Sequence, residues 1–465
     1  MSSDDRRSEQ ENERGGDGRV LLRARNGDVI RFDETGLILK LSDQVVADLR
    51  QRLFAPMDAE MLGDLDAWNL RAMGDWIFFD ANLPGMPGPR GYRRAVTGGA
   101  ILAETPGPVL GVLSLGGARR TRAIPGQGDY PYHIVAPEDD IGAVGMAGIE
   151  DAPETARAEG LREQTQDALL AEEMLRLRQK AGRGLPLMLT RCETDRAASL
   201  ADLETGKAFG NLMRAAANLK ALAATLDKPA KLAALSVDFV LEDILTPEAE
   251  FASAMRGLLE TLARAFWEID LRPVPVLMVF DTTASVPGRD RRQAQWELAV
   301  YGGEMGPVFT LPSYAMKMNA TLRPTDEAMR QRARTEAAAL MEMEAGRNWH
   351  CPRLLLAEWE GERMIRLRSD AAEPLVIDAD DPFGAGVDHG LRIEGPEGAV
   401  EIASVTVDPE EPRDILIELT QEAPRKGLML SYAWDGPGAL RDTWTSVLAP
   451  DVKRWALPAR LEVHG

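Results

Sequence analysis

The 465-residue sequence has few cysteines and histidines, and it has no long apolar run. Its two cysteines, Cys192 and Cys351, are too few for a disulfide framework or a thiolate zinc site, so we expect reduced structural thiols. Because no apolar run reaches the roughly 18 residues of a membrane helix, we expect no membrane insertion. Residues 1–18 are charged and lack an apolar segment, which predicts a disordered arm rather than a signal peptide.

Positive charge is also scarce. The chain has 54 Lys and Arg residues against 74 Asp and Glu residues, which gives a net charge of −20. The acidic residues are spread along the chain, as is typical of a solvated surface. This balance argues against direct binding of nucleic acid or of an anionic membrane.

Residues 19–105 predict a small α+β module at the N-terminus. The stretch "GRVLLRARNGDVIRF" alternates apolar and polar residues around Asn26-Gly27, a favoured hairpin turn. After Ser42, an expected N-cap, apolar residues follow at helical spacing. Residues 55–105 are rich in glycine, proline and tryptophan and are only weakly periodic.

Residues 106–351 predict an α/β domain with a parallel sheet covered by helices on both faces. Near-continuous apolar runs are typical of strands that are buried on both sides, and helical stretches separate them. The predicted strands cover 109–115, 185–189, 232–237, 274–280 and 308–311, and the predicted helices cover 156–181, 205–226, 247–268, 289–300 and 325–346. Ligand sites in such sheets lie at the carboxyl ends of the strands.

Residues 352–465 return to strand-like alternation, as in "DILIELT" and "GLMLSYAWDG", with turn residues between the strands. This pattern predicts an antiparallel β-sandwich.

The first strand of the predicted sheet ends in the stretch "VLGVLSLGGARRTRAI", over 109–124. Gly116 and Gly117 fit a tight turn from strand into helix, but Ala118 follows them and has no nucleophilic atom. The turn either binds a phosphate or acidic sugar or is simply solvated. The candidate binding residues are Arg119, Arg120 and Arg122.

The central domain resembles the SGNH (GDSL-like) hydrolases, particularly their sialate O-acetylesterase-like members. The stretch "ASLADLETGKAFGNLMRAA", over 198–216, is similar to the second sequence block of that family, and the order of five strand–helix units agrees. The terminal "YAW…LRDTW…WALPARL" stretch, over 432–461, is similar to the β-rich tail of bacterial and phage-encoded members.

The resemblance implies a set of catalytic residues, and this sequence replaces them. The family places a serine after the first strand, glycines in the second and third blocks, and an aspartate and a histidine in the last block. The corresponding positions here hold Ala118, Ala197, Val240, Ala320 and Arg323. An arginine cannot act as a general base near neutral pH, since its pKa exceeds about 12. We therefore expect no catalysis by these residues.

Other residues offer little to replace this chemistry. Ser114 lies two residues before Gly116 and is expected to face the sheet layer rather than the turn. The histidines all lie outside the last block: His133, His350, His389 and His464.

Three further features have two interpretations each. The stretch "DADDPFGAGVDHG", over 378–390, is either a calcium site or an Asp-Pro-Gly turn, and its spacing is not that of an EF-hand. In "NWHCPR", over 348–353, adjacent His350 and Cys351 point to opposite faces, so we expect structural roles. Trp434 and Trp444 either stack on sugar rings or belong to a core. We expect no metal and no cofactor.

Three functions remain open. The favoured one is a non-catalytic structural or receptor-binding protein, since the chain resembles the head spikes of alphaproteobacterial gene transfer agents. That resemblance implies assembly in the cytoplasm into an extracellular virion-like particle. It also implies a homo-oligomer at the capsid vertices, anchored to capsid or spike proteins through 19–105, that helps attachment to the recipient cell's surface polysaccharide. The second is an active carbohydrate O-acetylesterase with a rearranged site that uses Ser114, Ser199 or Asp243. The third is a cytoplasmic pseudoenzyme that acts as an assembly partner.

Overall fold

The computed structural model describes most of the chain after residue 64 and short segments before it. The described residues are 19–23, 28–33, 36–43, 45–46, 65–84, 86, 88–283, 285–286, 289–303, 306–396 and 398–465. The expected arm over 1–18, the Asn26-Gly27 turn and most of the helix expected after Ser42 lie outside these residues. Contacts divide the chain into two units, Met1–Asn82 with Pro89–Gly98 and Leu83–Gly88 with Gly99–Gly465.

The first unit is built from short antiparallel strands. Strands β1 (Arg19–Arg23), β2 (Val29–Asp33) and β3 (Gly36–Lys40) pair in chain order. The predicted hairpin pairing of β1 with β2 is confirmed, with Arg19 opposite Phe32. The weakly periodic stretch that follows contains β4 (Ala67–Met73), β5 (Trp76–Ala81) and β6 (Arg90–Ala95), which also pair antiparallel. In the next segment, β7 covers Gly98–Ala103.

The second unit contains a seven-stranded sheet with the order β11-β10-β13-β8-β14-β15-β18. All five predicted strands are confirmed as parallel neighbours: β8 (Val109–Gly116), β13 (Leu187–Thr194), β14 (Ala230–Asp238), β15 (Val276–Phe280) and β18 (Val308–Pro312). Two strands that the sequence did not predict extend one edge: β10 (Ile134–Pro137), which is parallel to β13, and β11 (Ala158–Gly160), which is antiparallel.

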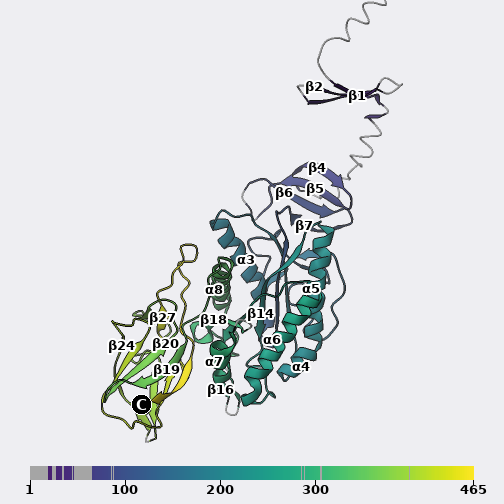
Figure 1. Cartoon of the computed structure of the whole chain (residues 1–465). Helices are drawn as coiled ribbons and strands as arrows, with labels where there is room; N and C mark the ends of the chain where they lie inside the picture. Colours follow the sequence, from purple (N-terminus) through teal and green to yellow (C-terminus); the bar gives the residue numbers. More distant parts are fainter. Residues whose placement is uncertain are drawn as a thin grey trace, which may run out of the picture. The chain divides into compact units, whose positions relative to one another are not determined.

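Helices cover both faces of this sheet (Figure 1). Helices α3 (Gln166–Lys180) and α8 (Asp326–Glu344) pack together on one face, and α5 (Lys207–Thr225) and α6 (Phe251–Glu268) lie on the other. The short helices are α4 (Leu200–Thr205) and α7 (Arg292–Tyr301). Thr165 and Thr325 are the N-caps of α3 and α8. The side chain of each accepts a hydrogen bond from the backbone N–H three residues later in the chain.

The helix expected over 156–181 starts later than predicted. Residues 158–164 instead form β11 and the two-residue strand β12 (Glu163–Gln164), which pairs with β9 (Ile124–Pro125). The polar sequence of this segment fits either a solvated helix or an edge strand, and pairing with β9 and β10 decides in favour of strands.

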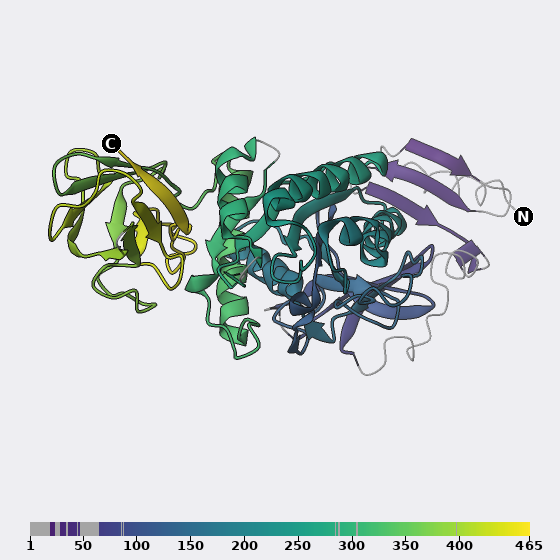
Figure 2. The ribbon, with the colours of Figure 1, turned by 90° about the horizontal axis from the view of Figure 1, so that it is seen from below.

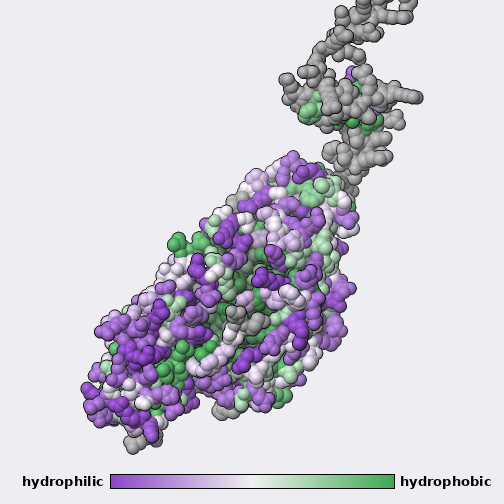
Figure 3. Space-filling view, viewed as in Figure 1, coloured by the Kyte–Doolittle hydropathy of each residue, from purple (hydrophilic) through white to green (hydrophobic). Residues whose placement is uncertain are grey.

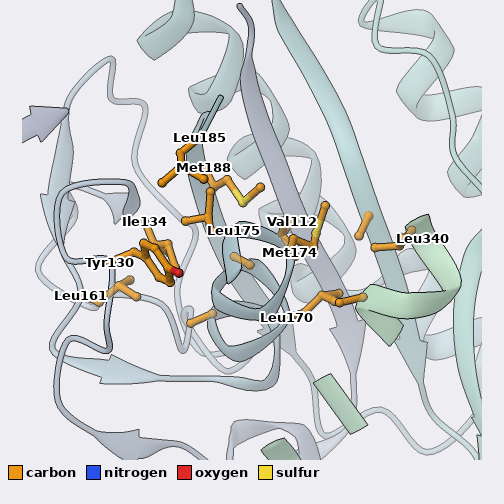
Figure 4. Packing of buried hydrophobic residues seen from close by; sticks show 14 of the residues in the cluster. Val112, Tyr130, Ile134, Leu161, Leu170, Met174, Leu175, Leu185, Met188 and Leu340 are labelled. Atoms are coloured by element: carbon orange, nitrogen blue, oxygen red, sulfur yellow. The ribbon is translucent and has the colours of Figure 1, made fainter. Parts of the chain in front are cut away.

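Alternate residues of β8 face the two helix layers. Val112 belongs to the apolar cluster between the sheet, α3 and α8, together with Leu170, Met174 and Leu340 (Figure 4). Gly111 faces α5 instead, and a Cβ there would come within 2.6 Å of Leu219. The central strand is therefore buried on both sides, which explains its continuous apolar sequence.

The C-terminal part is rich in strands, and Figure 2 shows them gathered to one side of the parallel sheet. They form an eight-stranded sheet and a separate pair: β19 (Leu354–Trp359), β20 (Met364–Ser369), β22 (Leu391–Gly395), β23 (Gly398–Val400), β24 (Ile402–Val407), β25 (Ile415–Leu419), β26 (Met429–Tyr432) and β28 (Ala459–His464) in the sheet, and β21 (Leu375–Ile377) with β27 (Leu440–Asp442). The expectation of purely antiparallel pairing is wrong at one point, since β19 and β28 run parallel. The last strand, β28, lies beside β19, the first strand of this part. The alternation of apolar and polar residues in the sequence does not reveal this pairing. A division into the two layers of a sandwich stays a prediction.

Hydrophilic residues predominate on the face of the second unit that Figure 3 shows, with apolar residues in smaller patches. Among the helices in the described part of the chain, none is both long and apolar enough to cross a membrane.

Candidate functional site at the carboxyl edge of the parallel sheet

The turn after β8 lies where the strand order of the sheet reverses. Strand β8 is first of the five predicted strands, and its neighbours are the second, β13, and the third, β14. Crevices at such reversals, outside the carboxyl ends of the strands, are where open α/β sheets bind ligands. A 3-10 helix, Ala118–Thr121, begins directly after the turn.

Close packing explains the two glycines of the turn. A Cβ on Gly116 would lie 2.6 Å from the carbonyl oxygen of Asp238, and one on Gly117 would overlap the side chain of Glu242. The backbone N–H of Gly117 donates to the Asp238 carbonyl at 3.0 Å. Glycine is required here by the approach of neighbouring atoms rather than by an unusual backbone angle.

Glu242 covers the start of the 3-10 helix. Its carboxylate accepts the backbone N–H of Arg119 at 3.2 Å and the Arg119 Nε–H at 3.1 Å. The same guanidinium also pairs with Asp281. Backbone N–H groups at such a turn are the donors that stabilise an oxyanion in acyl transfer. The Arg119 N–H already has an anionic partner.

Arg120 forms the centre of a buried network of charges. Its side chain is 1% exposed and pairs with Asp167 at 2.8 Å and with Asp238. Arg332 of α8 donates to both oxygens of Asp238, at 2.7 and 3.1 Å, and to Glu336 at 2.7 Å. The network joins residues from β14, α3 and α8 and the turn after β8.

The network shifts the pKa values of its members. Burial alone would raise the pKa of Asp238, but the guanidinium groups of Arg332 and Arg120 outweigh it and hold that pKa well below its usual range. Burial would lower the pKa of Arg120, yet Asp167 and Asp238 raise it. Asp238, Arg120 and Arg332 are therefore charged near neutral pH, whereas burial raises the pKa of Glu336.

A cavity of about 50 Å³ lies among these residues. Cavities that bind small molecules are usually about 300–1,000 Å³, so this one has no room for a sugar unless side chains move. Both charged and apolar side chains line it, and they include Arg119, Arg120, Arg122, Arg332, Asp238, Asp281, Ser313, Val240, Val279, Met316, Met318 and Met329. We call this cavity the cleft.

The structure brings only part of the predicted site to the cleft. Val240 and the three candidate arginines, Arg119, Arg120 and Arg122, line it. Ala118 is exposed beside them at the start of the 3-10 helix. Ala197, Ala320 and Arg323 lie in loops and do not line the cleft, although Pro324 does.

The hydroxyl and carboxyl groups weighed for a rearranged site all have structural partners. Ser114 is buried and donates to Asp167 of α3 at 2.6 Å, so it faces this helix layer rather than the turn. Ser199 is the N-cap of α4 and donates to Asp202. Asp243 accepts the backbone N–H groups of Leu200 and Thr246.

No histidine lines the cleft among the described residues, which include all four in the sequence. His133 is buried immediately before β10, where its Nδ1 lies 3.2 Å from the carbonyl oxygen of Pro186. His350 lies in the segment between α8 and β19, and His389 and His464 lie in the C-terminal part of the chain.

The two candidate tryptophans lie away from the cleft. Trp434 is 7% exposed, and the guanidinium of Arg292 covers its ring at 4.5 Å, so this ring presents no free face to a sugar. Trp444 is half-buried and meets Trp349 edge to face, with ring centroids 5.0 Å apart. Both tryptophans take part in packing within the second unit.

The aspartates of the acidic stretch over 378–390 have structural partners. Asp378 pairs with Arg441 and Lys453, and Asp381 accepts the backbone N–H groups of Ala385 and Gly386, as in a turn. In the described part of the chain, no group of three or more His, Cys, Asp or Glu residues is arranged to hold a metal.

Both cysteines are buried thiols. Burial raises the pKa of Cys192 to about 12. Cys351 Sγ contacts the Thr310 carbonyl oxygen at 3.2 Å, and burial raises its pKa as well.

Sequence reasoning missed the partners that define the cleft. Arg332 and Glu336 are four residues apart on α8, a spacing that also fits a solvated ion pair, so only the fold reveals their burial. Ser313 was missed as well, and its hydroxyl accepts the backbone N–H of Thr282 at 2.8 Å. Its position after β18 is the one signal that would have suggested a place at the sheet edge.

Comparisons with known proteins agree with this fold. No family model matches the chain, and a search of curated proteins found no match. Among solved structures, the chain is similar to a carbohydrate acetylesterase from Xanthomonas citri, with 13% identity, a TM-score of 0.50, and coverage of 81% of this chain and 85% of that one. A protein from Arabidopsis thaliana matches over 50% of this chain and 98% of its own, with 12% identity and a TM-score of 0.35. The first likeness shows a shared mixed α/β fold, in keeping with an SGNH-like domain.

Proposed function

We propose that the chain is a non-hydrolytic protein on an esterase-like α/β scaffold, and that it helps a phage-like particle attach to surface polysaccharide. The observation that carries the first part is the arrangement around Arg119. Glu242 takes the backbone N–H that an ester oxyanion would need, and a carboxylate there would repel an oxyanion. Ala118 stands beside it without a nucleophilic atom.

The polysaccharide part is supported by the likeness of the fold to a solved carbohydrate acetylesterase. The particle part is supported by the sequence resemblance to head spikes of gene transfer agents. Under this proposal the protein is a homo-oligomer, and residues 19–105 anchor it to a capsid or spike protein.

Binding to cells and to particles tests this proposal directly. Labelled full-length protein is incubated with capsulated alphaproteobacterial cells and with an acapsular mutant of the same strain, and it is also sedimented with particles. We expect binding to the capsulated cells alone and co-sedimentation that is lost when residues 1–105 are removed. Equal binding to both cell types would refute polysaccharide attachment, and absence from particles would favour a cytoplasmic assembly partner.

An active carbohydrate O-acetylesterase is the second candidate. It is favoured by the likeness of the fold to a solved carbohydrate acetylesterase and by the hydroxyl of Ser313, which lines the cleft. Release of acetate from acetylated polysaccharide that is abolished by Ser313→Ala would establish it. The two carboxylates that line the cleft among the described residues, Asp281 and Asp238, are both paired with arginines, so this serine has no free base there.

A further inference from the structure

The eight-stranded sheet of the C-terminal part ends at β24, an edge strand without a charged residue. Figure 1 shows β24 at the outer margin of this part. Its sequence is Ile-Ala-Ser-Val-Thr-Val, whereas every other strand of the sheet with five or more residues contains a charged residue. At the opposite edge, β23 has only three residues. Natural proteins usually protect long edge strands with charges or prolines, because a bare edge recruits another strand.

The backbone of β24 has free groups on the side away from β25. Directly after the strand, the Asp408 N–H donates to the Asp414 carbonyl at 3.0 Å. Because hydrogen-bonded residues alternate in an antiparallel pair, Thr406 also bonds to β25, and Val405 and Val407 point their N–H and C=O groups away from it. Within the described part of the chain, no strand pairs with that side of β24 and no backbone group bonds to these two valines there. Strand β21 contacts β24, but its ladder partner is β27.

A bulge limits the length of this edge. The register of β24 against β25 shifts between Ile402 and Ser404, so a partner strand meets regular geometry only over residues 404–407. The side chains of Ser404 and Thr406 are exposed, and those of Val405 and Val407 are half-buried. Few hydrogen bonds can form along so short an edge, and each contributes little net free energy in water. The edge therefore suits a reversible association.

A second copy of the chain is the partner that fits this edge. An antiparallel strand paired with itself about a two-fold axis continues the antiparallel pattern of β24 and β25, and two-fold dimers are the commonest homo-oligomers. The chain has a net charge of −20, so two copies repel each other over most of their surfaces. The uncharged strand lets them approach without opposing carboxylates along its length. Because this pairing uses the same edge on both copies, it closes at a dimer.

We propose that β24 is a dimer interface, where it pairs antiparallel with β24 of a second copy and joins the two sheets into one. The outward groups of Val405 and Val407 set the register, in which Val405 lies opposite the partner's Val407 and Thr406 lies opposite the partner's Thr406. This register forms about four backbone hydrogen bonds. The proposal supplies an interface for the homo-oligomer of the proposed function, but it does not depend on particles or polysaccharide.

Sedimentation of the full chain over a range of about 1 to 100 μM tests the dimer. We expect a reversible equilibrium between monomer and dimer. Thr406→Lys places two ammonium groups opposite each other, so it should raise the dimer dissociation constant at least about tenfold. Ala399→Lys is the matched control, because it adds the same charge to an exposed residue of the other edge strand, β23. A monomer at every concentration, or a Thr406→Lys dimer as tight as that of the wild type, would overturn the proposal. A monomer that still binds capsulated cells would overturn this interface and leave the attachment proposal standing.

Cross-linking of a Thr406→Cys variant tests the register. In the proposed pairing residue 406 forms a non-hydrogen-bonded pair with its own copy, where Cα atoms lie about 4.5 Å apart, within the range of a disulfide. Both native cysteines are buried, so they should not compete. After oxidation with diamide, a gel without reductant should show a linked dimer for Thr406→Cys and little for Ser404→Cys or Ala399→Cys. A Thr406→Cys chain that stays monomeric, or as much linked dimer from either control, would overturn the proposal.

Discussion

Replacing Asp238 with asparagine would remove the carboxylate that joins two arginines in the cleft. The Arg120 side chain is 1% exposed and that of Arg332 is 7% exposed, so water cannot readily replace the lost charge. Removing one partner of a buried ion pair lowers the free energy of unfolding by about 3–5 kcal/mol. Arg120 keeps Asp167 and Arg332 keeps Glu336, so we expect the lower end, about 3 kcal/mol.

Thermal unfolding followed by circular dichroism measures this effect. For a domain of this size, a loss of about 3 kcal/mol lowers Tm by roughly 6–12 °C. Asp151→Asn is the control, since Asp151 is 83% exposed and its pair with Lys207 should contribute under about 1 kcal/mol. Equal Tm values for Asp238→Asn and Asp151→Asn would refute the view that the buried ion-pair network stabilises the fold around the cleft.

The pH dependence of the same variant follows from the lowered pKa of Asp238. A carboxylate with a depressed pKa in the folded state stabilises the fold above its unfolded pKa, about 3.9, and loses that contribution as pH falls toward the folded value. The difference in stability between wild type and Asp238→Asn should therefore shrink as pH falls below about 4. A difference that stays constant down to pH 2 would contradict this assignment.

Three other substitutions or reactions test separate parts of the structure. Gly117→Ala should destabilise the protein by about 1–3 kcal/mol, since its Cβ would overlap Glu242, whereas Gly210→Ala in the open face of α5 should be neutral or stabilising in the same unfolding assay. Ala118→Ser should give no hydrolysis of p-nitrophenyl acetate, because no histidine among the described residues lines the cleft; turnover would show that a base has been overlooked. Cys192 should resist thiol reagents at pH 8 until the protein unfolds, since burial raises its pKa to about 12; rapid labelling of the folded chain would show that it is accessible.

The central sheet was predictable because its strands are buried on both faces. β8 reads as a continuous apolar run because Val112 faces α3 and α8 while Gly111 faces α5. The edge strands β10 and β11 escaped prediction, since they are short and β11 lies in polar sequence. The parallel pairing of β19 with β28 joins the two ends of the C-terminal part. The local alternation of apolar and polar residues does not indicate which distant strand is the partner.

The candidate site was predictable in its location but not in its contacts. The glycines after β8 indicated a tight turn at the carboxyl edge, and the structure shows that turn. The partners came from far along the chain, since Arg332 lies 94 residues after Asp238. Spacing within a sequence cannot show which arginine meets which carboxylate, or that burial rather than solvent surrounds them.

The most direct test of the proposed loss of hydrolysis is an assay of acetate release from acetylated polysaccharide by the purified full-length chain. Our account predicts no release above the buffer rate at neutral pH, and no change on substituting Ser313, Ser199 or Ser114. Release that depends on any one of these serines would contradict it and establish an active esterase.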